Sequence, residues 1–397
     1  MSEKKSALFQ NYARYPLTFV KGEGSKLWDD QGKEYLDFVS GIAVTNLGHV
    51  PPQVKAALID QLDQLWHVSN LYQIPGQEKL ADLLTSNSCL DAAFFCNSGA
   101  EANEAAIKLA RRYNNKVLGN ERYEIITFHQ SFHGRTLATL TATGQDKVKD
   151  GFHPLPEGFV YAAYNDKAGL ESIISDKTCA IMLEMVQGEG GVHPADPEFV
   201  EEIVRLCAKY NLLLIIDEIQ TGIGRTGTLF AYEQYGIKPD IITLAKGIGS
   251  GFPMGAMLGK AKLIEAFGAG SHATTFGGTP IAMAAGIATI ETMLAQDLPE
   301  RAGRMGELAV QKLEAALSGN PWVKGIRGLG LLIGVECAGP VAEVIVELQE
   351  AGLLVLSAGP NVIRILPNLL VTEEELDRGV ALLASVLSKK TAAAAQL

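Results

Sequence analysis

Cysteine is scarce in this chain of 397 residues, which contains only five. Cys89, Cys96, Cys179, Cys207 and Cys337 are scattered, are odd in number and form no C-x-x-C pair. We therefore expect neither a disulfide framework nor a zinc ribbon. Reduced thiols of this kind are typical of the cytoplasm, which is the location that we expect.

Long apolar runs and excess positive charge are also lacking. No stretch reaches the roughly 18 apolar residues of a membrane-spanning helix, so no transmembrane segment is expected. The first ten residues, MSEKKSALFQ, have no apolar core, so we expect no secretory signal. The 34 Lys and Arg residues against 45 Asp and Glu residues give a net charge of −11. Because nucleic acid and anionic membranes attract basic faces, we expect neither as a partner.

The composition and length of the chain are typical of a large globular protein. Hydrophobic residues make up 47% of it, and its length predicts two or three domains. Strand-like and helix-like segments alternate, with helical spacing at Val54, Leu58 and Leu62 and a helix from Pro197 to about Tyr210. The apolar runs that predict strands are 92–96, 124–128, 179–186, 212–216, 240–245 and 254–259. This alternation predicts an α/β fold with a mostly parallel sheet covered by helices on both faces.

The pattern changes after about Asp297. Long amphipathic helices are expected at 299–317, 340–352 and 372–387, with short strands at 331–337, 353–356 and 362–366. The last helix opens with a capping box, Thr372-x-x-Glu375. We predict a large domain over 51–297, a smaller α+β domain over 298–397, and an N-terminal segment, 1–50, that packs with the small domain.

Two further patterns give only weak evidence of a functional site. Residues 222–227, GIGRTG, match G-x-G-x-x-G after a strand, but the segment that follows is a poor helix, so a plain loop competes with a dinucleotide site. His129 and His133 suggest a metal pair, but no third ligand lies nearby in the sequence, and we expect no metal.

Small residues open a helix after the strand at 92–96. In Asn97-Ser-Gly-Ala-Glu-Ala-Asn103, free backbone N–H groups and a helix dipole suit a phosphate, while a plain N-capped turn fits equally well.

Other functional side chains follow further strands. Asp217 ends one predicted strand and Lys246 ends another. At such a position an acid or an amine is either an ordinary solvated side chain or a functional group of a site at the sheet edge. Phe132 and Arg135 lie beyond a third strand, where a ring can stack and a guanidinium can bind a carboxylate. Together, a phosphate site, a stacking ring, an acid and a lysine match the needs of pyridoxal phosphate.

The chain resembles the class III (subgroup II) aminotransferases of fold type I, which use pyridoxal 5'-phosphate. The resemblance runs from about Tyr15 to Ser388 and rests on NSGAEANEAAIKLAR, SFHGRTLATL, EMVQGEGGV, IIDEIQTGIGRTG, LAKGIGSGFPMGA and HATTFGGTP. Within the class, KGEGSKLWDDQGKEYLDFVSGIAVTNLGH, HVSNLY and GFHPLPEGFVY are most similar to the acetylornithine aminotransferases. GIGRTG then becomes a loop beside Asp217 rather than a dinucleotide site.

The resemblance implies a role for each matching residue. Lys246 bonds to the cofactor and shuttles the proton, and Asp217 pairs with the ring nitrogen. The remaining cofactor contacts are Gln220 at the phenolic oxygen, Phe132 on the ring, Ser98, Gly99 and Ala100 at the phosphate, and Thr275 at the phosphate from the neighbouring subunit. The substrate contacts are Thr274, Arg135 at the α-carboxylate, and the pair of Glu189 and Arg364. Ile42 replaces a tyrosine typical of ornithine aminotransferases, which suits an acylated substrate.

The implied reaction transfers the δ-amino group of N2-acetyl-L-ornithine to 2-oxoglutarate, in arginine biosynthesis, within a homodimer that shares its active sites. Rival donors are succinylornithine, N-succinyl-diaminopimelate, 4-aminobutyrate and ornithine. Other rivals are the related glutamate semialdehyde aminomutase reaction and a scaffold protein without activity, which would need a broken cofactor site.

Overall fold

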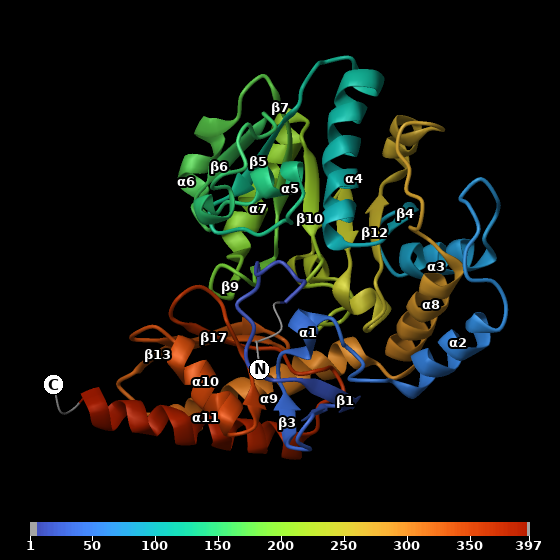
Figure 1. The fold of residues 1–397 in the computed structure, drawn as a ribbon. Helices are drawn as coiled ribbons and strands as arrows, with labels where there is room; N and C mark the ends of the chain where they lie inside the picture. Colours follow the sequence, from blue (N-terminus) through green and yellow to red (C-terminus); the bar gives the residue numbers. More distant parts are fainter. Residues whose placement is uncertain (1–5, 395–397) are drawn as a thin grey trace.

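A computed structural model of the protein describes residues 6–394 and is built around a seven-stranded sheet (Figure 1). Its strands, in spatial order, are β4 (Ala92–Cys96), β12 (Gly255–Gly259), β11 (Ile241–Leu244), β10 (Leu213–Asp217), β7 (Thr178–Leu183), β5 (Glu124–Phe128) and β6 (Phe159–Ala162). The predicted strands are all present. β6 has no counterpart among them.

The sheet is parallel except at one strand. β11, β10, β7, β5 and β6 pair in parallel, whereas β12 runs antiparallel to both β11 and β4. The sheet is therefore mostly parallel, as predicted. β12 is the exception, because the short connection over 245–254 has no room for the crossover helix that parallel neighbours need. β4 consequently points the same way as β11, so β4, β5, β10 and β11 all end at one edge.

Helices cover both faces of this sheet, as predicted. Leu214 and Ile216 of β10 pack in one apolar cluster with α7 (Pro197–Tyr210), whereas the alternate residues Leu213 and Ile215 pack in another with α4 (Gly99–Arg112). Successive strand residues point to opposite faces, so a continuous apolar strand needs a cover on each.

The N-terminal strands join the C-terminal part of the chain. β1 (Phe19–Glu23), β2 (Lys26–Asp29) and β3 (Glu34–Asp37) form a sheet that is completed by β15 (Leu353–Leu354), which pairs with β3 in parallel. A further sheet has the order β13 (Val323–Leu329), β14 (Leu332–Cys337), β17 (Val362–Ile365) and β16 (Leu356–Ser357). These sheets lie together below the large sheet in Figure 1. The three-part domain division stays a prediction, which the pairing of β3 with β15 supports.

The remaining elements connect these sheets. β8 (Val186–Gln187) and β9 (His193–Pro194) pair with each other. The other helices are α1 (Ser40–Ala43), α2 (Pro52–Leu62), α3 (Pro75–Ser86), α5 (Leu137–Ala142), α6 (Lys167–Leu170), α8 (Pro280–Ala295), α9 (Leu298–Leu317), α10 (Ala342–Glu350) and α11 (Glu373–Ala394). The predicted capping box at α11 is confirmed, since Thr372 and Glu375 exchange backbone-to-side-chain hydrogen bonds of 2.9 and 3.2 Å.

Within residues 6–394 no single helix has both the length and the apolar composition to cross a membrane. α8 and α9 meet that test only as a pair bent by 66°. All five cysteines are free thiols.

Candidate active site

A cavity of about 420 Å³ opens at the edge of the large sheet where β4, β5, β10 and β11 end. Its lining includes most of the predicted site residues: Ser98, Gly99, Ala100, Phe132, Arg135, Asp217, Gln220 and Lys246. These residues come from separate strand ends, so the parallel sheet brings them together.

Helix α4 begins at one end of the cavity, and its first turn has the N-cap that one of the two interpretations predicts. Ser98 is the N-cap, with its Oγ accepting the N–H of Glu101, while the Glu101 carboxylate accepts the N–H groups of Asn97 and Ser98 at 2.7 and 2.9 Å. Gly99 and Ala100 follow, and the first N–H groups of a helix have no intrahelical acceptor. These groups and the helix dipole suit a phosphate. A Cβ at Gly99 would lie 2.8 Å from the Cδ1 of Ile219, so a larger residue here would displace the Ile219 side chain.

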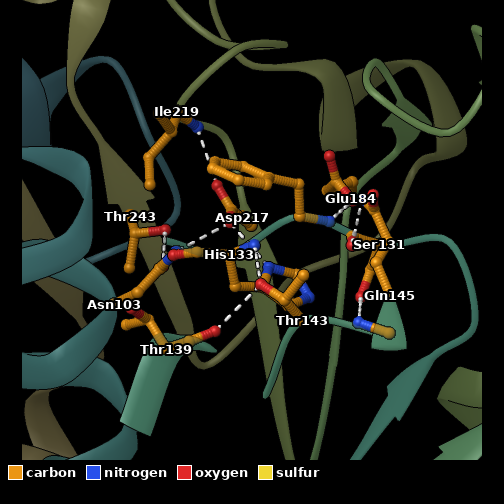
Figure 2. A network of polar contacts seen from close by, with 12 residues as sticks. Asn103, Ser131, His133, Thr139, Thr143, Gln145, Glu184, Asp217, Ile219 and Thr243 are labelled. Carbon is orange, nitrogen blue, oxygen red and sulfur yellow. Dashed lines mark hydrogen bonds and ion pairs between the residues drawn. The ribbon is translucent and has the colours of Figure 1, made fainter. Parts of the chain in front are cut away.

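Asp217 lies at the end of β10, buried and held by a polar network (Figure 2). Its Oδ2 accepts hydrogen bonds from Asn103 Nδ2 and His133 Nδ1, both at 2.8 Å. Its Oδ1 accepts the N–H of Ile219 at 3.1 Å. Asn103 is held in turn by the hydroxyl of Thr243 at 2.7 Å. His133 Nδ1 carries its hydrogen because it faces a carboxylate oxygen.

The supporting residues around Asp217 were not predicted. His133 was considered only as a metal ligand, and Asn103 only as part of a helix start. Asn103 lies on the face of α4 that packs on the sheet, so its buried position on an otherwise alanine-lined face is the signal that the sequence offers. Within residues 6–394 no group of three or more His, Cys, Asp or Glu side chains could hold a metal ion.

Lys246 follows β11 and opens a short 3-10 helix, Lys246–Gly249. Its φ of 48° is in the left-handed region, a strained conformation that non-glycine residues adopt mainly at functional sites. Burial lowers the pKa of Lys246, which Arg364 lowers further, while the carboxylates of Glu189 and Asp217 oppose the shift. A lowered pKa favours the uncharged, nucleophilic amine.

Glu184 also lines the cavity and was not predicted. Its Oε2 accepts the backbone N–H of Phe132 at 3.1 Å, which fixes the segment that carries the Phe132 ring (Figure 2). Burial, and next the repulsion from Asp217, raise the pKa of Glu184 well above its usual value. The guanidinium carbon of Arg135 lies over the Phe132 ring, 5.6 Å from its centre.

Arg364, on β17, is 2% exposed and binds Glu189, which is 31% exposed. Its Nη1 donates to Glu189 Oε1 at 2.9 Å, to Gln220 Oε1 at 3.1 Å and to the Gly188 carbonyl at 3.0 Å. Burial raises the pKa of Glu189, but Arg364 and Lys246 outweigh it and the net shift is downward. Arg364 Nε is buried and has no hydrogen-bond partner among the described residues.

Five of the predicted residues lie outside the cavity lining: Glu189 and Arg364, which reach it through Gln220, and Thr274, Thr275 and Ile42. Thr274 and Thr275 line a second cavity, which shares Asn97 with the first. Thr274 Oγ1 accepts hydrogen bonds from Asn97 and from the Gly277 backbone at 3.3 and 3.1 Å. Ile42 is partly exposed in the kinked helix α1, with a φ of 66° that is unusual for a β-branched residue.

The cavity fits pyridoxal phosphate in its chemistry. The free N–H groups of α4 suit the phosphate, Asp217 Oδ1 suits a protonated pyridine nitrogen, and Lys246 suits the aldehyde carbon. Phe132 and Ile219 border the same cavity and offer apolar side chains against which the cofactor ring can pack.

Known proteins of one family are similar to the whole chain. The family model described as aminotransferase class-III matches residues 8–387. An acetylornithine aminotransferase of Halalkalibacterium halodurans is 56% identical over 97% of this chain and 98% of its own.

Solved structures agree in fold. The N-acetylornithine aminotransferase of Stenotrophomonas maltophilia superposes with a TM-score of 0.84 at 35% identity, covering 96% of this chain and 98% of that one. An ornithine aminotransferase of Toxoplasma gondii, described with partial occupancy of PLP at its active site, superposes with a TM-score of 0.93 at 32% identity, covering 97% and 93%. The chain therefore belongs to the class III aminotransferases and is a transferase that depends on pyridoxal phosphate.

Proposed function

We propose that the enzyme transfers the δ-amino group of N2-acetyl-L-ornithine to 2-oxoglutarate, giving N-acetylglutamate 5-semialdehyde and glutamate, as a step of arginine biosynthesis. Relatives above half identity over nearly the full chain carry the acetylornithine name. The observation that carries the proposal is the Glu189–Arg364 ion pair, because it lets one site serve two substrates whose ends differ in charge.

The cofactor supplies an electron-accepting ring when it is bound. Asp217 Oδ1 holds a proton on the ring nitrogen, while His133 and Asn103 hold the other oxygen. Lys246 Nζ, whose pKa is lowered by burial, takes the proton from the substrate carbon and returns it during the exchange. Ser98, Gly99 and Ala100 bind the phosphate, Gln220 reaches the phenolic oxygen, and Phe132 stacks on the ring.

The two half-reactions use different anchors. With the acylated diamino acid bound, Arg135 holds the α-carboxylate and Glu189 covers Arg364. With glutamate or 2-oxoglutarate bound, Glu189 turns away and Arg364 binds the α-carboxylate. Glu189 is partly exposed, which gives its side chain room to leave.

A homodimer with shared active sites, located in the cytoplasm, completes the proposal. Thr275 reaches the phosphate of the partner's site, and Thr274 and Ile42 contact the substrate. The position of Thr274 and Thr275 outside the lining of the first cavity of their own chain supports this proposal.

A panel of amino donors tests the assignment, with 2-oxoglutarate as acceptor and glutamate formation as the readout. We expect kcat/KM for N-acetylornithine to exceed that for ornithine, 4-aminobutyrate and the succinylated donors by about tenfold or more. If another donor is preferred, the assigned substrate is wrong although the cofactor chemistry stands. A Lys246→Ala variant serves as the control and should lose essentially all turnover.

A further inference from the structure

The loop that carries Glu189 lies across one row of the C-terminal sheet. Arg327 of β13, Gly334 of β14 and Arg364 of β17 are directly paired in register across these antiparallel strands. Directly paired residues project from the same face of a sheet. The row therefore has an arginine at each end and a glycine in the middle.

The loop rests on the glycine. A Cβ at Gly334 would lie 2.8 Å from the Cβ of Val192, so the loop backbone approaches the sheet where this row has no side chain. On one side of that point Arg364 binds the Gly188 carbonyl and Glu189. On the other side Arg327 binds the carbonyls of Gly191 and Val192.

Arg327 holds these carbonyls with several donors at once. Its Nε donates to the Gly191 and Val192 carbonyls at 3.0 and 2.9 Å, and its Nη2 donates to the Gly191 carbonyl at 2.7 Å. Its Nη1 is paired with Glu336 of β14, which fixes the guanidinium plane. A lysine in this place has no planar fork and does not replace all of these bonds.

The glycines of the loop pack closely against neighbouring residues. A Cβ at Gly188 would lie 2.2 Å from Gln220 Oε1, and one at Gly190 would lie 2.7 Å from the Gln130 carbonyl. Gly191 has a φ of 121°, which other residues rarely adopt. With the backbone held at both ends, Glu189 is left with the rotation of its own side chain.

We propose that Arg327 is a positioning residue that fixes the backbone of the 188–192 loop, so that Glu189 covers and uncovers Arg364 by side-chain rotation alone. The inference rests on the proposed alternation between two half-reactions. Loss of Arg327 frees the loop, lets Glu189 leave Arg364, and weakens the half-reaction that needs Arg364 covered. The half-reaction with glutamate needs Arg364 uncovered and is spared.

Single-turnover kinetics of the holoenzyme, followed by the cofactor absorbance, test this separately for the two half-reactions. For Arg327→Met we expect kcat/KM to fall about tenfold with the best donor of the panel and less than about threefold with glutamate. Arg327→Lys should show a weaker form of the same imbalance. Gly334→Ala, whose new Cβ displaces Val192, should reproduce it. Arg378→Met, which removes an exposed arginine paired with Glu34, should change neither half-reaction.

A double-mutant cycle with Glu189→Gln supplies the decisive comparison. If Arg327 acts through Glu189, Arg327→Met should add less than twofold to the donor defect of Glu189→Gln. Equal losses in both half-reactions, or full additivity with Glu189→Gln, would overturn the proposal. Because the donor is the one that the panel selects, a wrong substrate assignment and a wrong role for Arg327 give different results.

Discussion

At the scale of single residues, the two oxygens of Asp217 have different partners. Oδ2 accepts both side-chain donors, from Asn103 and His133 (Figure 2). Oδ1 has the Ile219 N–H as its only described donor and is the oxygen left for a ring nitrogen. We therefore expect Oδ1 to be the oxygen that meets the cofactor.

Replacing His133 with leucine tests this division. The change removes one donor to an ionised carboxylate, a loss of about 1.5–3 kcal/mol, so we expect kcat to fall roughly 10- to 100-fold. His129→Leu is the matched control, since His129 is the exposed histidine of the same segment. A His133→Leu enzyme whose kcat stays within twofold of wild type would contradict the role.

Glu218 gives a prediction about pH and stability. Burial raises the pKa of this carboxyl to about 7 from 4.5. Between these values the unfolded chain has released the proton and the folded chain keeps it, so stability falls as pH rises. Relative to wild type, Glu218→Gln should therefore gain up to about 3 kcal/mol between pH 4.5 and pH 7. Unfolding midpoints at pH 5 and pH 7.5 check this, with exposed Glu300→Gln expected to show no such gain.

At the scale of elements, Arg225 connects three parts of the chain. It lies in the GIGRTG loop, is fully buried, and donates to Leu331 at 3.1 Å, to Asn46 at 2.8 Å and to the Pro367 carbonyl. Burial lowers its pKa to about 9. The motif that resembles a dinucleotide site is therefore a structural connection between the large sheet and the N- and C-terminal segments.

Arg225→Met should destabilise the protein by about 2–4 kcal/mol, because buried acceptors on three segments lose their donor. Urea unfolding measures the change. Arg304→Met removes an exposed arginine from an i,i+4 pair on α9 and should alter stability by less than about 0.5 kcal/mol. Equal effects of the two substitutions would show that the buried connection contributes nothing.

Elements with strong local patterns could be predicted from the sequence, and elements defined by distant contacts could not. The buried strands, α7 and the capping box of α11 follow from apolar runs and capping residues. β6 was missed although residues 159–164, FVYAAY, form an apolar run; it is an edge strand and is only partly buried. Helix α1 is kinked, with Asp37 accepting the N–H groups of Val39 and Ser40, which no local pattern predicts.

The candidate site divides in the same way. Residues at strand ends, such as Asp217 and Lys246, could be found because sheet topology brings strand ends together. His133, Asn103 and Glu184 act through other residues, and their positions depend on packing between segments far apart in the sequence.

At the scale of the whole molecule, large apolar side chains remain uncovered around the second cavity. Leu71 is 87% exposed, and Trp66, Tyr72 and Phe276 are also exposed, next to the segment that carries Thr275. Such a surface is typical of a contact between protein chains, and the proposed dimer would cover it.

Mixing two inactive variants tests the shared site. In a hybrid of Lys246→Ala and Thr275→Val subunits, one site has both defects and the other has neither, if Thr275 serves the partner. We expect the mixture, after subunit exchange, to regain about a quarter to a half of wild-type activity at limiting cofactor. If Thr275 serves its own subunit, every site carries one defect and no activity returns. Each variant treated alone is the control.

The pairing of β3 with β15 has a consequence for synthesis on the ribosome. Lys33, just before β3, binds the carbonyl of Glu350, 317 residues later in the chain. While the nascent chain grows, the N-terminal sheet keeps an open edge, the kind of surface on which strands of other chains pair. The sheet of β1, β2 and β3 thus stays open at β3 until β15 has been translated, and we expect chaperones that bind unpaired strand edges to act on it during that interval.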